Sequence, residues 1–98
     1  MTSRDWWYST GEQRRQTAMA KILDLVGDLS PTTEQPLREL LARYYQELLA
    51  QTSGSPVYVL MRLDLDIATC LHQNGIVLSP ANSKRIHDLI KLTPGYIK

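Results

Sequence analysis

The chain has 98 residues, with 11 lysines and arginines against 10 aspartates and glutamates, and a hydrophobic fraction of 43%. This length supports one domain, and the hydrophobic fraction is typical of a globular chain and not of a disordered one. The net charge of +1 argues against a general nucleic-acid binder, whose affinity rests on many phosphate contacts. The longest uncharged apolar run is about five residues, Val57 to Met61, whereas a membrane-spanning helix needs about 20.

The N-terminal residues and the cysteine content predict the cellular compartment. The segment from Met1 to Trp7 lacks the apolar region of a secretory signal. Cys70 is the single cysteine, so an internal disulfide cannot form. We therefore expect the protein in the reducing cytoplasm.

Residue spacing predicts four helices within one domain that covers residues 1–98. Apolar residues recur at three- and four-residue steps, as they do on one face of a helix. Proline interrupts this pattern because it lacks an N–H group, and glycine follows helix ends because it accepts a left-handed backbone. The helices are expected at about 10–29, 34–52, 56–74 and 80–92.

The predicted helix ends carry recognisable capping signals. Thr10 and Gln13 have the spacing of a capping box at the first helix. Ser55-Pro56 and Ser79-Pro80 place a serine cap before a proline at the first helical position of the third and fourth helices. Asn74-Gly75 ends the third helix. Short connections of this kind favour antiparallel neighbours, so the expected fold is all-α, an antiparallel four-helix bundle.

Each predicted helix has an apolar stripe that is expected to form the core. The connector Ile76-Val77-Leu78 is expected to tuck under the bundle, since no partner strand is visible. The stripes are Met19, Ile22, Leu23, Val26 and Leu29; Leu37, Leu40, Leu41, Tyr44, Leu48 and Leu49; Val57, Leu60, Met61, Leu63, Ile67, Ala68 and Leu71; and Ile86, Leu89 and Ile90 with Ala81.

Residues that could support catalysis or metal binding are few and dispersed. Cys70 and His72 are two positions apart on one predicted helix, where side chains do not face each other. Asp64 and Asp66 likewise point to different sides, which favours a solvated acidic face over an acid–base pair. A zinc-binding spacing is absent. We therefore expect neither an enzyme nor a metal or cofactor site.

Charge is distributed unevenly along the chain. Residues 76–98 hold Lys84, Arg85, Lys91 and Lys98 against Asp88, a local net charge of +3. One interpretation is a solvated helix face. The other is a recognition surface for an acidic protein patch or an anionic leaflet, where each basic residue contributes about 1 kcal/mol.

The aromatic cluster Trp6-Trp7-Tyr8 precedes the first helix cap. Three consecutive aromatic side chains are costly to leave in water. They are expected to fold over the bundle as a lid, or to contact lipid or a protein groove, because Trp and Tyr favour such boundaries.

Four segments of the chain have a recognisable order and spacing. Residues 53–68 lead from Ser-Gly-Ser-Pro-Val through an aliphatic run and an arginine to an alternation of acidic and aliphatic residues. A turn at 75–79 and a helix at 83–90 follow, and the chain starts with Trp-Trp-Tyr-Ser-Thr-Gly-Glu-Gln-Arg-Arg at 6–15. This arrangement resembles the immunity proteins for pediocin-like (class IIa) bacteriocins, of the enterocin A/mundticin type. The tail, Pro94 to Lys98, departs from the Arg-Tyr-Gly-Tyr-like ending of many relatives.

The resemblance implies a cytosolic four-helix bundle that protects a bacteriocin producer from its own peptide, without catalysis or a cofactor. The implied partner is the membrane part of the mannose phosphotransferase permease with bound bacteriocin. The C-terminal half is implied to determine which bacteriocin is resisted. We therefore expect a monomer, partly associated with the inner face of the membrane, that uses Lys84, Arg85, Lys91, Tyr96 and Lys98 for partner recognition.

Two other functions stay open on the sequence. A small helical nucleic-acid-binding regulator would use the helix at 80–92 for recognition, although the near-neutral charge argues against it. Salt-dependent DNA binding would favour this alternative. A minor enzyme or metal carrier would use Cys70 and His72, and metal analysis of the purified protein would test it.

Overall fold

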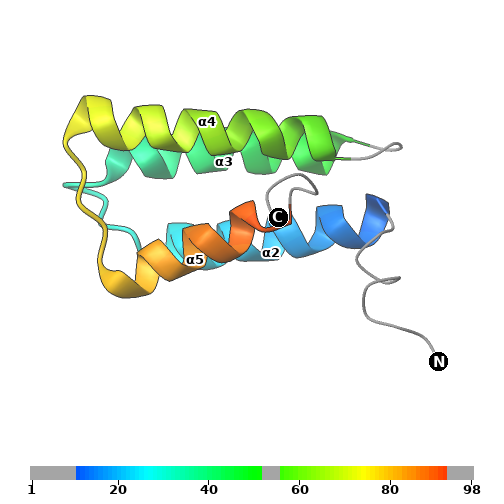
Figure 1. The fold of residues 1–98 in the computed structure, drawn as a ribbon, viewed down its shortest axis with the longest axis horizontal. Coiled ribbons are helices and arrows are strands. Elements are labelled where there is room, and N and C mark those ends of the chain that lie inside the picture. Colours follow the sequence, from blue (N-terminus) through cyan, green and yellow to red (C-terminus); the bar gives the residue numbers. More distant parts are fainter. Residues whose placement is uncertain (1–10, 52–55, 93–98) are drawn as a thin grey trace.

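The computed structural model describes residues 11–51 and 56–92, which form helices joined by turns and contain no strand. This confirms the predicted all-α class. Each helix begins and ends within two residues of its expected position. The helices are α2 (Gly11–Asp28), α3 (Gln35–Ala50), α4 (Val57–Asn74) and α5 (Pro80–Ile90) (Figure 1).

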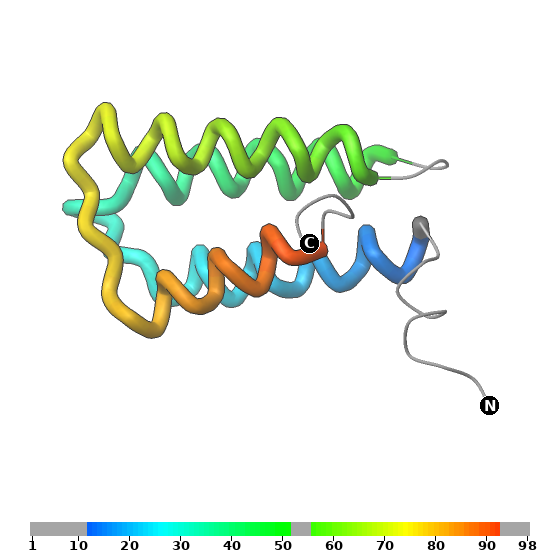
Figure 2. The backbone as a smooth tube through the Cα atoms, in the orientation of Figure 1, coloured from blue at the N-terminus to red at the C-terminus, as the bar shows by residue number. Residues whose placement is uncertain are grey.

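The four helices form the expected antiparallel bundle. α2 packs against α3 and α5, and α3 also packs against α4. Figure 2 shows the helices as two pairs, with α3 beside α4 and α2 beside α5. The turn from α2 to α3 and the turn from α4 to α5 lie at the same end of the molecule. The side between α4 and α5 has the least extensive packing of the four.

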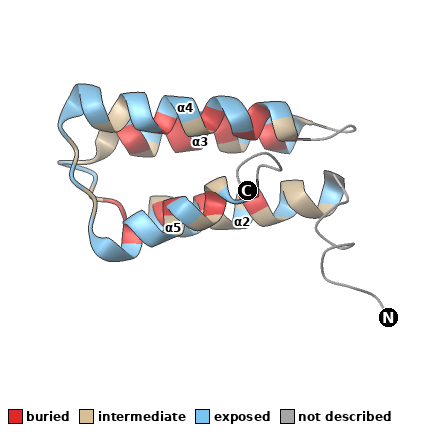
Figure 3. Ribbon diagram, viewed as in Figure 1, coloured by how far each residue is buried: buried red, intermediate tan, exposed pale blue. Residues whose placement is uncertain are grey.

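One continuous apolar core lies between the helices, as the red residues on the inward faces in Figure 3 show. Every helix contributes to it, and Tyr44 is its one buried aromatic residue among those the structure describes. The fully or almost fully buried residues include Ala18, Ile22, Leu25, Leu37, Leu41, Leu48, Leu60, Leu63, Ile67 and Leu89.

Some predicted core positions are wrong, because apolar spacing leaves the exact direction of a helix face undetermined. The residues predicted to be buried but found exposed are Leu23, Leu49, Met61, Ala68 and Ala81. The core residues that the stripes omitted are Ala18, Leu25, Val59 and Leu92. On α2, for example, the predicted stripe includes Leu23, but the face that meets the other helices carries Ile22 and Leu25.

The capping signals are confirmed at two of the helix ends and corrected at a third. Ser79 Oγ accepts a hydrogen bond from the backbone N–H of Asn82 at 3.1 Å, with Pro80 in the first turn of α5. Gly75 ends α4 in the left-handed conformation, with φ of 61°. Pro56 occupies the position before α4 and not its first helical position, and its side chain is buried. Thr10 and Ser55 lie outside the described residues.

The connector between α4 and α5 is only partly covered. Ile76 and Leu78 are half-buried and pack against the core, whereas Val77 is 89% exposed. The expectation that all three residues tuck under the bundle is therefore wrong for Val77.

Candidate functional site

The C-terminal helix α5 presents basic side chains to solvent. Lys84 is 76% exposed in its side chain and pairs with Asp88, one turn later, at 3.1 Å. Lys91 is exposed at the C-terminal end of the helix. Both cations therefore lie on the outer side of α5 and are available to a partner.

A third lysine, Lys21 of α2, belongs to the same surface. The hydrogen bond from Lys84 holds the pKa of the Asp88 carboxyl below its ordinary value, and Lys84, Lys21 and Lys91 add a favourable electrostatic interaction. Lys21 and Lys91 thus act on the Asp88 carboxyl together with Lys84, and we refer to these three lysines as the basic surface. Lys21 is remote from Lys84 and Lys91 in the sequence, so charge along the chain did not group it with them, and only the packing of α2 on α5 brings it close.

Arg85, also predicted to recognise a partner, has a more internal position. Its Nη1 donates to Asp28 Oδ2 of α2 at 3.0 Å and to Asn82 Oδ1 at 2.7 Å. Asn82 is 3% exposed, so the guanidinium links a buried amide to a surface carboxylate. Arg85 therefore connects α5 to α2 in addition to contributing positive charge.

The remaining aromatic and C-terminal candidates lie outside the described residues. These are Tyr96 and Lys98, predicted to recognise a partner, and Trp6, Trp7 and Tyr8, predicted as a lid or contact surface.

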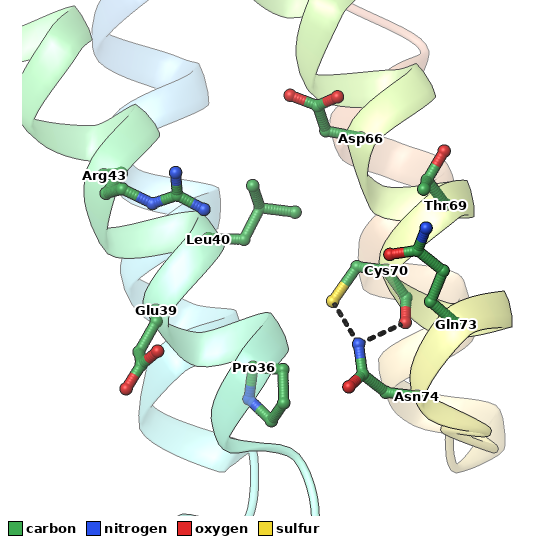
Figure 4. A pocket seen from close by; sticks show the side chains of 9 residues that line it. All are labelled: Pro36, Glu39, Leu40, Arg43, Asp66, Thr69, Cys70, Gln73 and Asn74. Carbon is green, nitrogen blue, oxygen red and sulfur yellow. Dashed lines mark hydrogen bonds between the residues drawn. The ribbon is translucent and has the colours of Figure 1, made fainter.

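A polar groove of about 450 Å³ lies between α3 and α4 (Figure 4). Cys70 lines it, is half-buried and packs against the core. The Asn74 amide donates to the Cys70 carbonyl oxygen at 2.9 Å. His72 is exposed and does not line this groove. Within residues 11–51 and 56–92, the structure brings together no group of three His, Cys, Asp or Glu residues that could hold a metal ion.

A hydrogen bond and an ion pair join α3 to α4 beside this groove. The Tyr44 hydroxyl donates a part-buried hydrogen bond to Asp66, and the Arg62 guanidinium lies 5.7 Å from the Tyr44 ring centroid. Arg62 also forms an ion pair with Glu47. Burial, followed by the hydrogen bond and the charge of Asp66, raises the pKa of Tyr44 to about 12. Asp66 is thus an interhelical acceptor and not merely part of a solvated acidic face.

None of the four described helices combines the length and the apolar character needed to span a bilayer. The arrangement can bind a partner through charge and shape on its outer surfaces. The basic surface on α5 and α2 offers cations to an acidic group. The groove between α3 and α4 offers mainly neutral and paired polar groups.

Three comparisons with known proteins each match about four fifths of the chain. Residues 13–93 match the bacteriocin immunity protein family. A protein of Carnobacterium maltaromaticum, described as an uncharacterized 9.1 kDa protein in the 3′ region of the BM1 immunity protein, is 35% identical over 81 residues, which are 82% of this chain and 96% of that protein. The crystal structure of an immunity protein that contributes to the self-protection of bacteriocin-producing Enterococcus mundtii 15-1A is 26% identical, with a TM-score of 0.74 over 81% of this chain and 95% of that one.

Proposed function

Because the chain belongs to the bacteriocin immunity protein family, we propose that it protects its producer cell from a pediocin-like bacteriocin by binding and not by catalysis. The proposed partner is the membrane part of the mannose phosphotransferase permease with the bacteriocin bound, approached from the cytosolic side. In this role the bundle binds to the complex of permease and bacteriocin and so blocks the leakage of cell contents through it. The protein itself undergoes no chemical change.

The basic surface is the observation that supports this proposal. Lys21, Lys84 and Lys91 come from two helices and act on one carboxylate, that of Asp88. Of these three lysines only Lys84 forms an ion pair among the described residues. Two of them belong to the C-terminal part of the chain, where the resemblance places bacteriocin specificity. A cluster of this size also attracts the protein reversibly to an anionic inner leaflet, because each lysine there contributes about 1 kcal/mol.

Protection of a sensitive strain tests the proposal directly. The gene is expressed in a bacterium that is sensitive to pediocin-like bacteriocins, and survival is measured against a panel of these peptides. We expect protection against at least one peptide of the panel and none against a pore-forming peptide that does not use the permease. Deleting the permease removes both sensitivity and any effect of the protein. Absence of protection against the whole panel, with the protein present and folded, contradicts the proposal.

Charge variants test whether the basic surface takes part. Lys84→Gln together with Lys91→Gln is compared with Arg38→Gln together with Arg43→Gln, which removes the same charge from α3. We expect the α5 variant to lose protection and the α3 variant to keep it, with equal abundance and helical content. Adding Lys21→Gln deepens the loss. Full protection by the α5 variant would show that the basic surface is not the contact.

A further inference from the structure

Helix α4 has two apolar faces, and the bundle uses only one of them. Its inner face carries Val59, Leu60, Leu63 and Ile67, all buried. Its outer face carries three large apolar residues that the core leaves uncovered: Tyr58 at 78%, Met61 at 48% and Leu65 at 69% exposure.

The three exposed residues form one continuous stripe. Tyr58, Met61 and Leu65 are separated by three and four positions, so they are neighbours along one side of the helix. Their spacing is that of the anchors with which a helix contacts another apolar surface. We refer to Tyr58, Met61 and Leu65 as the outer stripe.

The charges beside the outer stripe indicate what can cover it. Arg62 on one side is already paired with Glu47 of α3. Asp64 on the other side lies three positions after Met61 and next to Leu65, and among the described residues it forms no ion pair. An apolar surface that also presents a lysine or arginine opposite Asp64 would satisfy both the stripe and this carboxylate.

We propose that the outer stripe of α4 is a protein-docking surface for an apolar helix that carries a basic residue opposite Asp64. The inference rests on the proposed function, and it assigns a second contact to the same partner that meets the basic surface. The partner's helix covers Tyr58, Met61 and Leu65, and its cation pairs with Asp64.

Two other occupants fit the stripe less well. The first is an anionic bilayer. Its negatively charged headgroups would repel the carboxylates of Asp64 and Asp66 on the same helix. A second copy of the chain would need roughly 800 Å² on each subunit for a stable dimer. The largest exposed apolar patch on a typical monomer measures about 300–600 Å², so three partly exposed side chains fall short of that area.

Paired substitutions test the role of the stripe. Met61→Gln with Leu65→Gln is compared with Leu23→Gln with Leu49→Gln, which alters two leucines of similar exposure on α2 and α3. Because these side chains are exposed, both variants are expected to fold with unchanged helical content. Loss of the stripe contacts should weaken partner affinity by roughly tenfold or more, so the α4 variant loses protection and the control keeps it. Equal protection by both variants overturns the proposal.

Substitution of Asp64 tests the charge of the occupant. Asp64→Lys keeps the stripe but places a cation where the partner's cation is expected, and protection should fall further than with Asp64→Asn. Protection that is unchanged or improved by Asp64→Lys would show that the occupant is not basic and would overturn this assignment.

Site-specific photocrosslinking separates this inference from the proposed function. A benzophenone amino acid is placed at Leu65, at Lys84 or at Leu23 in cells with tagged permease membrane subunits and added bacteriocin. Crosslinks from positions 65 and 84, but not 23, support both proposals. A crosslink from 84 without one from 65 leaves the proposed function intact and overturns the docking surface, whereas no crosslink from any position overturns both.

Two measurements on the purified protein test the competing occupants. Analytical ultracentrifugation should show a monomer at micromolar concentration. Flotation with vesicles of phosphatidylcholine and phosphatidylglycerol should show equal binding by wild type and by the Met61→Gln/Leu65→Gln variant. A dimer, or vesicle binding, that this variant abolishes would assign the stripe to a second copy or to lipid and overturn the proposal.

Discussion

Arg85 of α5 donates from its Nη1 to Asp28 Oδ2 at the end of α2, at 3.0 Å. The two residues come from helices far apart in the sequence, and their pairing ties the last described helix to the first. A basic residue that the sequence nominates for recognition thus also has a partner within the fold. Effects of changing Arg85 on protection therefore have to be separated from effects on stability.

A double-mutant cycle measures this link between α2 and α5. Arg85→Ala, Asp28→Ala and the double variant are unfolded in urea, and we expect a coupling free energy of roughly 0.2–1 kcal/mol, because side chains that are 41% and 55% exposed are well solvated. The coupling should decrease in high salt. A coupling free energy of several kcal/mol would mean that the pair is far less solvated than its exposure indicates.

Tyr44 should make stability fall at high pH. Its pKa is raised from 10.0 to about 12 in the folded protein, so its contribution is fully present below pH 10 and is lost as the pH rises to about 12. Over this interval, deprotonation would place a phenolate against the Asp66 carboxylate. We expect wild type to lose more unfolding free energy between pH 10 and 12 than Tyr44→Phe does.

Tyrosine absorbance provides the direct measurement for this group. The difference in ultraviolet titration between wild type and Tyr44→Phe should show one tyrosine ionising near pH 12. At pH 7 the same substitution should cost about 1 kcal/mol for the lost hydrogen bond. A difference titration centred near pH 10 would contradict the hydrogen bond from the Tyr44 hydroxyl to Asp66.

Arg15 connects α2 to the C-terminal end of α3. Its Nη1 donates to the Leu48 carbonyl oxygen at 2.9 Å, and its Nη2 pairs with Glu12 at 2.8 Å. The Leu48 carbonyl also accepts the backbone N–H of Gln51 at 3.2 Å, and a cation at the C-terminal end of a helix is stabilising. Arg15→Ala should cost about 1 kcal/mol of unfolding free energy, which lowers the melting temperature of a domain of this size by about 4–8 °C. The neighbouring change Arg14→Ala is the control, and an equal decrease for both variants would show that the Leu48 contact is unimportant.

Two glycines should respond to alanine with opposite signs. Gly75 has a φ of 61°, which costs an alanine about 1–2 kcal/mol. Gly27 lies within α2, and a methyl group added there meets no atom within 4 Å, so Gly27→Ala should stabilise by about 0.5–1 kcal/mol. Urea denaturation of both variants measures the two effects. A stabilising Gly75→Ala would contradict the left-handed end of α4.

The local sequence determined where the helices begin and end. Ser79, Pro80 and Gly75 act on groups within three or four residues of themselves, through a hydroxyl that accepts a backbone N–H, a missing N–H, and a left-handed turn. Such short-range effects are legible without the rest of the chain. The number of helices and the antiparallel order followed from them.

The direction of each helix face and the composition of the surfaces were decided by tertiary packing. The spacing on α2 allowed a stripe that includes Leu23, yet Leu25 is buried and Leu23 is 53% exposed, because the other helices lie on the opposite side. Lys21 reaches Asp88, and Arg85 reaches Asp28, only because α2 packs on α5. These relationships join residues that are remote in sequence, and apolar spacing alone does not determine which side chains of two helices meet.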